Sequence, residues 1–124
     1  MKKVISTPEA PQAIGPYSQA IETNGRLYVS GQIPVDPKDG TMPSGIVHQT
    51  EQVLRNIGAI LSTAGYTFDQ VVKTTVLMKN MSDFAAMNEV YARYFTEKMP
   101  ARACFGVSAL PKDAEVEIEV IAEK

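Results

Sequence analysis

Residues 101–122 read ARACFGVSALPKDAEVEIEVIA, and this stretch decides the fold class. Residues 101–108 and 115–122 carry apolar residues that alternate with small or charged ones, which predicts two strands. The intervening Leu110-Pro111-Lys112-Asp113 is typical of a turn, so we expect the two strands to form a final hairpin. The chain therefore ends in β-sheet, and the upstream segments are placed relative to it.

Two helices are predicted before this hairpin. The first runs from about Gly45 to Ala64, where Gly65 suits the left-handed position that ends helices. Ser82 predicts the N-cap of the second, which is expected to reach about Lys98 because a Met-Pro pair follows. Both contain apolar residues at helical spacing: Val53, Ile57, Ile60, Leu61 and Ala64 in the first, and Phe84, Met87, Tyr91, Tyr94 and Phe95 in the second.

Further strands are predicted upstream. Asn24-Gly25 lies between the strand-like runs 19–23 and 26–30 and indicates a hairpin, because both turn residues tolerate positive φ. Residues 71–79 predict another strand, and residues 2–5 a short additional one. Two helices cover one face of such a sheet but not both. We therefore expect an α+β fold whose other sheet face meets solvent or another chain.

Composition restricts the class of protein. The length of 124 residues fits one domain, 1–124. The net charge of −2 argues against a broad nucleic-acid-binding face. Cys104 is the single cysteine, so no disulfide forms within the chain. No apolar segment follows Lys2 and Lys3 as in a signal peptide, and no run approaches the length of a membrane span. We therefore expect a cytoplasmic location.

Strand alternation gathers polar groups near the end of the chain. Arg102 and Cys104 share one face of the first predicted strand, and Glu115, Glu117 and Glu119 share one face of the second. The apolar residues of the second strand are the natural floor for the helices. We therefore expect Arg102, Cys104 and the glutamates to lie together on the face that the helices leave open.

Each of these side chains has two interpretations. The planar guanidinium of Arg102 suits a carboxylate ligand, although spacing alone favours an ordinary ion pair with a neighbouring glutamate. Cys104 is either a small buried residue or a pocket-lining thiol; a nucleophile needs a nearby cation or base, and His48 is expected to be exposed on the first helix. Glu117 belongs to a solvated polar face, or it is a general acid/base whose pKa is set by burial.

Other chemistries find no support in the sequence. One histidine and one cysteine cannot supply a metal cluster, and there is no phosphate-binding or dinucleotide-binding glycine motif. A reaction without metal or cofactor is therefore the simplest enzymatic interpretation. Tyr17, in a loop fixed by glycine and proline, and Ser30-Gly31, at the end of a strand, are further candidates to contact a small anion.

Six segments recur together in one known family. They are Ala13–Gln19, Ser30–Pro34, Val72–Val76, Asn88–Tyr91, Pro100–Cys104, and Leu110–Ala114 with Val116–Glu119. In this order they resemble the RidA (YjgF) family of reactive enamine/imine deaminases, and the resemblance covers nearly the whole chain. It implies a chorismate-mutase-like mixed sheet with two helices on one face, and a homotrimer whose bare sheet faces form a central barrel.

The resemblance also implies an activity and a site. The family hydrolyses 2-iminobutanoate and 2-iminopropanoate to 2-oxoacids and ammonia, without a cofactor, in clefts between subunits. By motif position, Arg102 binds the substrate carboxylate, Glu117 orients water, and Cys104 lines the pocket. Tyr17, Ser30, Gly31 and Asn88 fall on further substrate-binding positions.

The chain departs from the family pattern at two places. Ala103 replaces a common serine. Phe105-Gly106-Val107 replaces Val-Glu-Val. Because Gly106 shares the face of Arg102, the missing glutamate is expected to widen the pocket or to remove a negative charge from it.

Three other functions compete with the deaminase. One is a non-enzymatic regulator that binds small acids in the same cleft. A second is an endoribonuclease, as in the family's older naming. The third is a structural trimer with a vestigial pocket. No nucleic-acid or membrane partner is expected.

Overall fold

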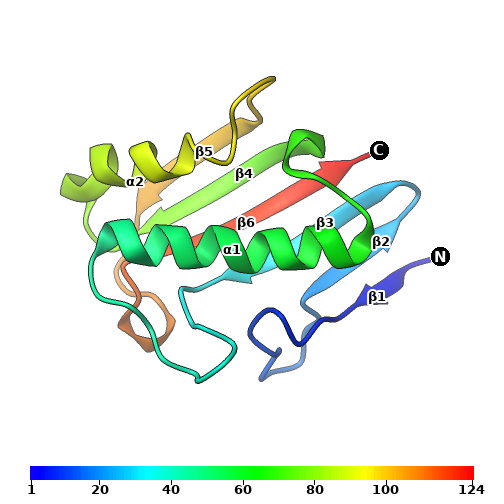
Figure 1. Cartoon of the computed structure of the whole chain (residues 1–124), viewed down its shortest axis with the longest axis horizontal. Helices are drawn as coiled ribbons and strands as arrows, with labels where there is room; N and C mark the ends of the chain where they lie inside the picture. The colour runs from blue at the N-terminus through cyan, green and yellow to red at the C-terminus, as the bar shows by residue number, and fades with distance from the viewer.

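The computed structural model describes all 124 residues and contains one six-stranded sheet in the order β1-β2-β3-β6-β4-β5 (Figure 1). Only β4 and β5 run parallel; every other neighbouring pair is antiparallel. The strands are β1 Lys3–Ile5, β2 Ala20–Thr23, β3 Arg26–Gln32, β4 Val71–Met78, β5 Ala101–Gly106 and β6 Val116–Glu123.

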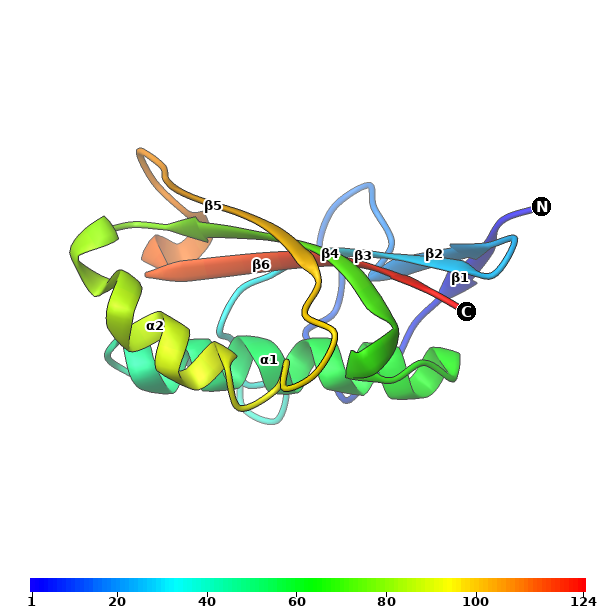
Figure 2. The same cartoon turned by 90° about the horizontal axis from the view of Figure 1, so that it is seen from above.

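Two α-helices, α1 (Ile46–Ala64) and α2 (Phe84–Tyr91), lie on the same side of this sheet, as Figure 2 shows edge-on. Short 3-10 turns occupy Phe68–Gln70, Met81–Asp83 and Pro111–Asp113. The mixed sheet with both helices on one face confirms the predicted α+β fold. None of the helices combines the length and apolar character needed to cross a lipid bilayer.

The core lies between the helices and the sheet. Leu54, Ile57 and Leu61 on α1 and Ile118 and Val120 on β6 belong to one cluster of buried apolar residues. Burial alternates along β6, as expected for a strand with one face on the core. The opposite sheet face carries no helix, which confirms the predicted bare face.

Local signals fixed several elements correctly. Asn24 and Gly25 both adopt positive φ (50° and 75°) and join β2 to β3. Gly65 takes the left-handed conformation at the end of α1, with φ of 83°. The short strand predicted at residues 2–5 is β1, and His48 is exposed on α1 as expected.

The predicted final hairpin is wrong. β5 does not pair with β6, because β4 lies between them and pairs with both. Parallel pairing of β4 with β5 needs a crossover of a dozen or more residues, and residues 79–100, with α2, provide it. The Pro111–Asp113 turn therefore connects two strands that are separated by a third.

The second helix is shorter than predicted. Ser82 lies in the preceding 3-10 turn rather than at the N-cap, and the α-helix ends at Tyr91 instead of Lys98. Beyond it, the amides of Arg93 and Tyr94 bond to carbonyls three residues back, and Lys98 has a positive φ of 46°. The chain thus leaves the helix through a tight turn while the aromatic side chains of that turn still pack on the core.

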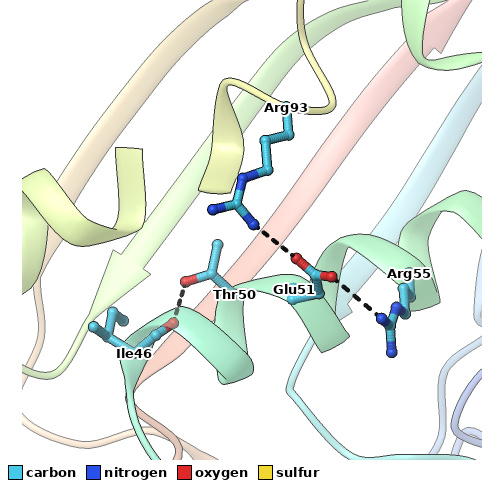
Figure 3. Close-up of polar contacts among 5 residues, drawn as sticks. All are labelled: Ile46, Thr50, Glu51, Arg55 and Arg93. Atoms are coloured by element: carbon cyan, nitrogen blue, oxygen red, sulfur yellow. Dashed lines mark hydrogen bonds and ion pairs between the residues drawn. The ribbon is translucent and has the colours of Figure 1, made fainter. Parts of the chain in front are cut away.

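Glu51 fastens the two helical segments together. Its carboxylate accepts from Arg55, one turn further along α1, at 3.2 Å and from Arg93, after α2, at 3.4 Å (Figure 3). Thr50 donates to the Ile46 carbonyl of the same helix at 2.7 Å. Of these contacts, only the one from Arg93 links α1 to the turn that follows α2.

Candidate active site in two halves

Strand register places the predicted site residues on two different faces. Cys104 pairs with Val76, and Val76 pairs with Ile118, so all three point towards the helices. Arg102 shares that face because it is two residues from Cys104. Glu117 pairs with Leu77 and points to the bare face. The expectation that Arg102, Cys104 and Glu117 lie together on the open face is therefore wrong, because it assumed the absent hairpin.

The row of three glutamates is also shorter than expected. Glu115 precedes β6, and its carboxylate accepts from the N–H of Gly45 at the start of α1, at 3.2 Å. A carboxylate is favourable there because the helix N-terminus carries partial positive charge. Only Glu117 and Glu119 remain together on the bare face.

Arg102 forms the first half of the site. Its Nη1 donates to Asn88 Oδ1 at 2.7 Å, and its guanidinium carbon lies 4.9 Å from the ring centre of Tyr91. It makes none of the chain's four salt bridges, so the ion pair favoured from spacing is wrong. The guanidinium borders an open pocket of about 330 Å³ lined by Asn88, Tyr91, Ala92, Met99, Pro100 and Arg102. An exposed fork of donors without a carboxylate partner suits an anionic ligand.

Cys104 lies beside this half but does not line its pocket. Its Sγ lies 3.7 Å from Met78 Sδ, and the side chain packs against the core. Burial raises the pKa of the thiol, and the opposing charge of Arg102 only moderates that increase. A protonated thiol is a poor nucleophile, so the geometry favours the packing interpretation over the predicted pocket-lining one.

Glu117 forms the second half, on the bare face. It borders a pocket of about 550 Å³, whose walls are Ile14, Tyr17, Ser30, Gly31, Ile33, Pro111, Lys112, Glu117 and Glu119. Partial burial raises the pKa of Glu117, and the charge of Glu119 adds to the effect. A raised pKa moves a carboxyl group closer to the range in which a general acid/base works best.

The loop before β2 closes one side of this second half. Residues 13–19 rise above the sheet on the side opposite the helices (Figure 2). Ser30 Oγ donates to the Ser18 carbonyl at 2.6 Å, and the Ser30 N–H donates to the Gln19 carbonyl at 2.9 Å. Both donors of Ser30 are thus engaged in holding the loop. Ser30 still lines the pocket, and its contact with an anion stays a prediction.

The structure brings together Tyr17, Gly31 and Glu117, as predicted, and separately pairs Arg102 with Asn88. Sequence reasoning missed the aromatic contacts of Arg102, because Phe84 and Tyr91 were assigned to an apolar core stripe. It also missed Lys112, which lines the second half from a turn where its φ is 56°. Gly106 lies against Met81 and lines neither half, so the pocket widening expected there finds no support.

Known proteins match this chain along nearly its whole length. A family model described as endoribonuclease L-PSP matches residues 7–124. The chain is 58% identical to a RutC family protein of Pyrococcus horikoshii, over 100% of this chain and 99% of the relative. It is 51% identical to the 2-iminobutanoate/2-iminopropanoate deaminase of Mus musculus, over 98% and 91%.

Two solved structures share the fold of this chain over nearly its whole length. A protein of the conserved Rid family from Yersinia pestis has a TM-score of 0.97 and 53% identity, with 100% of each chain covered. E. coli TdcF with bound serine has a TM-score of 0.95 and 42% identity, with 98% of each chain covered.

Proposed function

Because the chain belongs to the RidA family, whose model is described as endoribonuclease L-PSP, we propose that it hydrolyses small 2-imino acids to 2-oxoacids and ammonia. The substrates would be 2-iminobutanoate and 2-iminopropanoate. The observation that carries the proposal is the Arg102 guanidinium, which is oriented by Asn88 and Tyr91 and has no carboxylate partner in the chain.

The proposal includes a homotrimer with sites between subunits. In one chain Arg102 and Glu117 point to opposite faces of the sheet. A site that uses both therefore needs Arg102 from one subunit and Glu117 from its neighbour. Exposed apolar side chains such as Tyr28 and Phe105 on the bare face support burial against another copy.

Arg102 would bind the substrate carboxylate through two parallel N–H donors and so fix the imine carbon in the cleft. Water adds to this carbon, and Glu117 accepts a proton from the water oxygen and returns it to the substrate nitrogen, which gives a carbinolamine. Glu117 then moves the hydroxyl proton of the carbinolamine to the same nitrogen, and the hydroxyl oxygen becomes the carbonyl oxygen. The C–N bond then breaks, leaving the 2-oxoacid and ammonia. Tyr17 and Ile14 would cover the reacting atoms from the loop before β2.

Two named relatives support this chemistry. The mouse relative is named as a deaminase of these imino acids, and the TdcF structure is described as holding serine, an amino acid whose carboxylate matches the ligand class. For an endoribonuclease, by contrast, the chain's single histidine, His48, lies exposed on α1 and lines neither half of the site.

The test couples purified protein to threonine dehydratase in the presence of semicarbazide, which competes for the released imine. We expect the protein to increase 2-oxobutanoate formation at the expense of the semicarbazone. Arg102→Ala should abolish the increase, and Arg102→Lys should retain only a small part because lysine lacks the planar fork. Unchanged activity in Arg102→Ala would refute the assignment.

A regulator or a vestigial trimer makes different predictions. Each predicts no turnover in the coupled assay, and the regulator also predicts ligand binding that changes association with a partner. RNA cleavage that survives further purification, and that Glu117→Gln abolishes, would favour the endoribonuclease instead.

A further inference from the structure

One face of α2 forms a cradle around the guanidinium of Arg102. Phe84, Asn88 and Tyr91 are spaced i, i+4, i+7 and therefore lie along one side of the helix. The Arg102 guanidinium carbon is 5.5 Å from the ring centre of Phe84 and 4.9 Å from that of Tyr91. Asn88 Oδ1 accepts from Nη1 between them, at 2.7 Å. Three contacts from one helix thus hold the cation.

Tyr91 is itself held rigidly. Its hydroxyl shares a hydrogen bond of 2.8 Å with Thr74 Oγ1 on β4, and Thr74 is fully buried. Its ring lies 4.5 Å from that of Phe95, with an interplanar angle of 34°. Only 6% of Tyr91 is exposed. The ring therefore cannot turn away from the guanidinium without breaking the bond to Thr74.

Thr74 also lies directly opposite Arg102 in the register of β4 and β5. The three residues therefore contact one another in turn. The Arg102 guanidinium packs on the Tyr91 ring, the Tyr91 hydroxyl bonds to Thr74, and Thr74 on β4 pairs with Arg102 on β5. A shift of α2 relative to the sheet would disturb all three contacts at once.

We propose that Tyr91 is a positioning residue that fixes the plane of the Arg102 guanidinium, and with it the orientation of the bound carboxylate. The inference rests on the proposed function, in which Arg102 binds that carboxylate. The Tyr91 ring lies 4.9 Å from the guanidinium carbon, and Asn88 holds one Nη1 donor. Together these contacts restrict rotation of the planar group, so its remaining donors keep one direction. A planar fork held in one orientation loses little conformational freedom when it binds a carboxylate bidentately.

The test measures 2-oxobutanoate binding by calorimetry together with KM and kcat in the coupled assay. Tyr91→Leu removes the ring, and loss of the cation–π contact is expected to raise Kd and KM roughly tenfold. Tyr91→Phe keeps the ring, and its Kd is expected to stay within about threefold of wild type. The difference between the phenylalanine and leucine variants measures the contact of the ring with the guanidinium, and the difference between the phenylalanine variant and wild type measures the part that the bond to Thr74 plays in holding the ring.

Tyr94→Leu is the matched control. Tyr94 follows α2, and its ring centre lies 5.3 Å from that of Phe68. It packs against the same core as Tyr91 but makes no cation–π contact with Arg102. We expect this variant to lose thermal stability as Tyr91→Leu does, with Kd for 2-oxobutanoate unchanged. If Tyr91→Leu does not fold, Phe84→Leu tests the cradle from its other ring and should raise Kd about threefold.

The outcomes separate this inference from the proposed function. If wild type shows no deaminase turnover but binds 2-oxobutanoate with the Tyr91 dependence above, the inference stands and the reaction is wrong. If turnover is present and Tyr91→Leu leaves Kd and KM unchanged, the inference is overturned. Absence of any 2-oxobutanoate binding by wild type overturns it as well.

Discussion

The carboxylate of Glu117 lies directly against Gly31, in the space that a side chain at residue 31 would occupy. A Cβ built on Gly31 would overlap Glu117 Oε2 and stand 2.9 Å from Glu117 Cδ. The need for glycine here comes from this close approach rather than from backbone conformation, because φ at Gly31 is not positive. The carboxylate of the proposed acid/base group therefore packs directly against the backbone of Gly31.

Gly31→Ala should therefore reduce activity without unfolding the protein. The added methyl group forces the Glu117 carboxylate to move, and a misplaced general base commonly costs about 10²-fold in rate. The cost in stability should stay below about 1 kcal/mol because a flexible side-chain end can shift. Steady-state kinetics and thermal unfolding check the two parts. Wild-type kcat/KM in Gly31→Ala would contradict the placement of Glu117.

The pH dependence of the reaction should report the pKa of Glu117. Burial and the charge of Glu119 raise this pKa above the ordinary 4.5. Glu117 accepts a proton only when ionised, so kcat/KM should rise with pH through the raised pKa and fall below it. Tyr17, Lys112 and Glu119 are the other titratable groups that line this half of the site.

Glu119→Gln removes the second cause of the shift but leaves the burial. The acid limb of the kcat/KM profile should therefore move to lower pH while remaining above that of an ordinary glutamate. An acid limb that stays at the same pH in Glu119→Gln would show that another group controls it.

Cys104→Ala should keep most of the activity. The thiol is packed against Met78, and burial raises its pKa, so it is not a thiolate at neutral pH. We expect kcat/KM within about fivefold of wild type and slow alkylation by iodoacetamide that speeds up as the pH rises. A loss comparable to that of Arg102→Ala would instead assign the sulfur a direct part in the chemistry.

Gln19 should contribute strongly to stability, because it fastens the N-terminal segment. Its side-chain oxygen accepts from the Thr7 N–H at 2.7 Å, and its Nε2 donates to the carbonyls of Thr7 and Pro11 at 3.1 and 2.7 Å. Gln19→Leu leaves the Thr7 N–H and the Pro11 carbonyl without these partners, which should cost about 2–4 kcal/mol. Denaturant unfolding measures the loss.

Gln12→Leu is the control for that experiment. Gln12 is exposed and makes one bond, to the Thr7 carbonyl at 3.0 Å, so the substitution should cost less than about 1 kcal/mol. Equal losses in the two variants would mean that the Gln19 network does not fasten the N-terminal segment.

Local signals in the sequence predicted most of the elements. The Asn24-Gly25 turn, the glycine after α1 and the apolar stripe of α1 each depend on a few neighbouring residues, and each was confirmed. The length of α2 was missed because its aromatic stripe continues into the following turn, where Tyr94 and Phe95 still pack on the core. A buried stripe does not require an unbroken helix.

Strand neighbours could not be predicted from alternation. Alternation correctly predicted which residues share a face within β5 and within β6, but which face of β5 meets the helices depends on β4, which is inserted between the two strands. Arg102 and Glu117 were therefore placed on one face when they belong to two. The aromatic support of Arg102 was missed for a related reason: Phe84 and Tyr91 serve the core and the cation together.

The central claim is that Arg102 of one subunit and Glu117 of another form one site, and subunit mixing tests it most directly. Arg102→Ala and Glu117→Ala are each expected to be inactive. When the two variants are unfolded together, refolded and assayed, random closed trimers should regain activity at about one quarter of their sites, each with both wild-type residues. Activity that never exceeds the sum of the separate variants, in trimers shown by mass spectrometry to be mixed, would contradict the account.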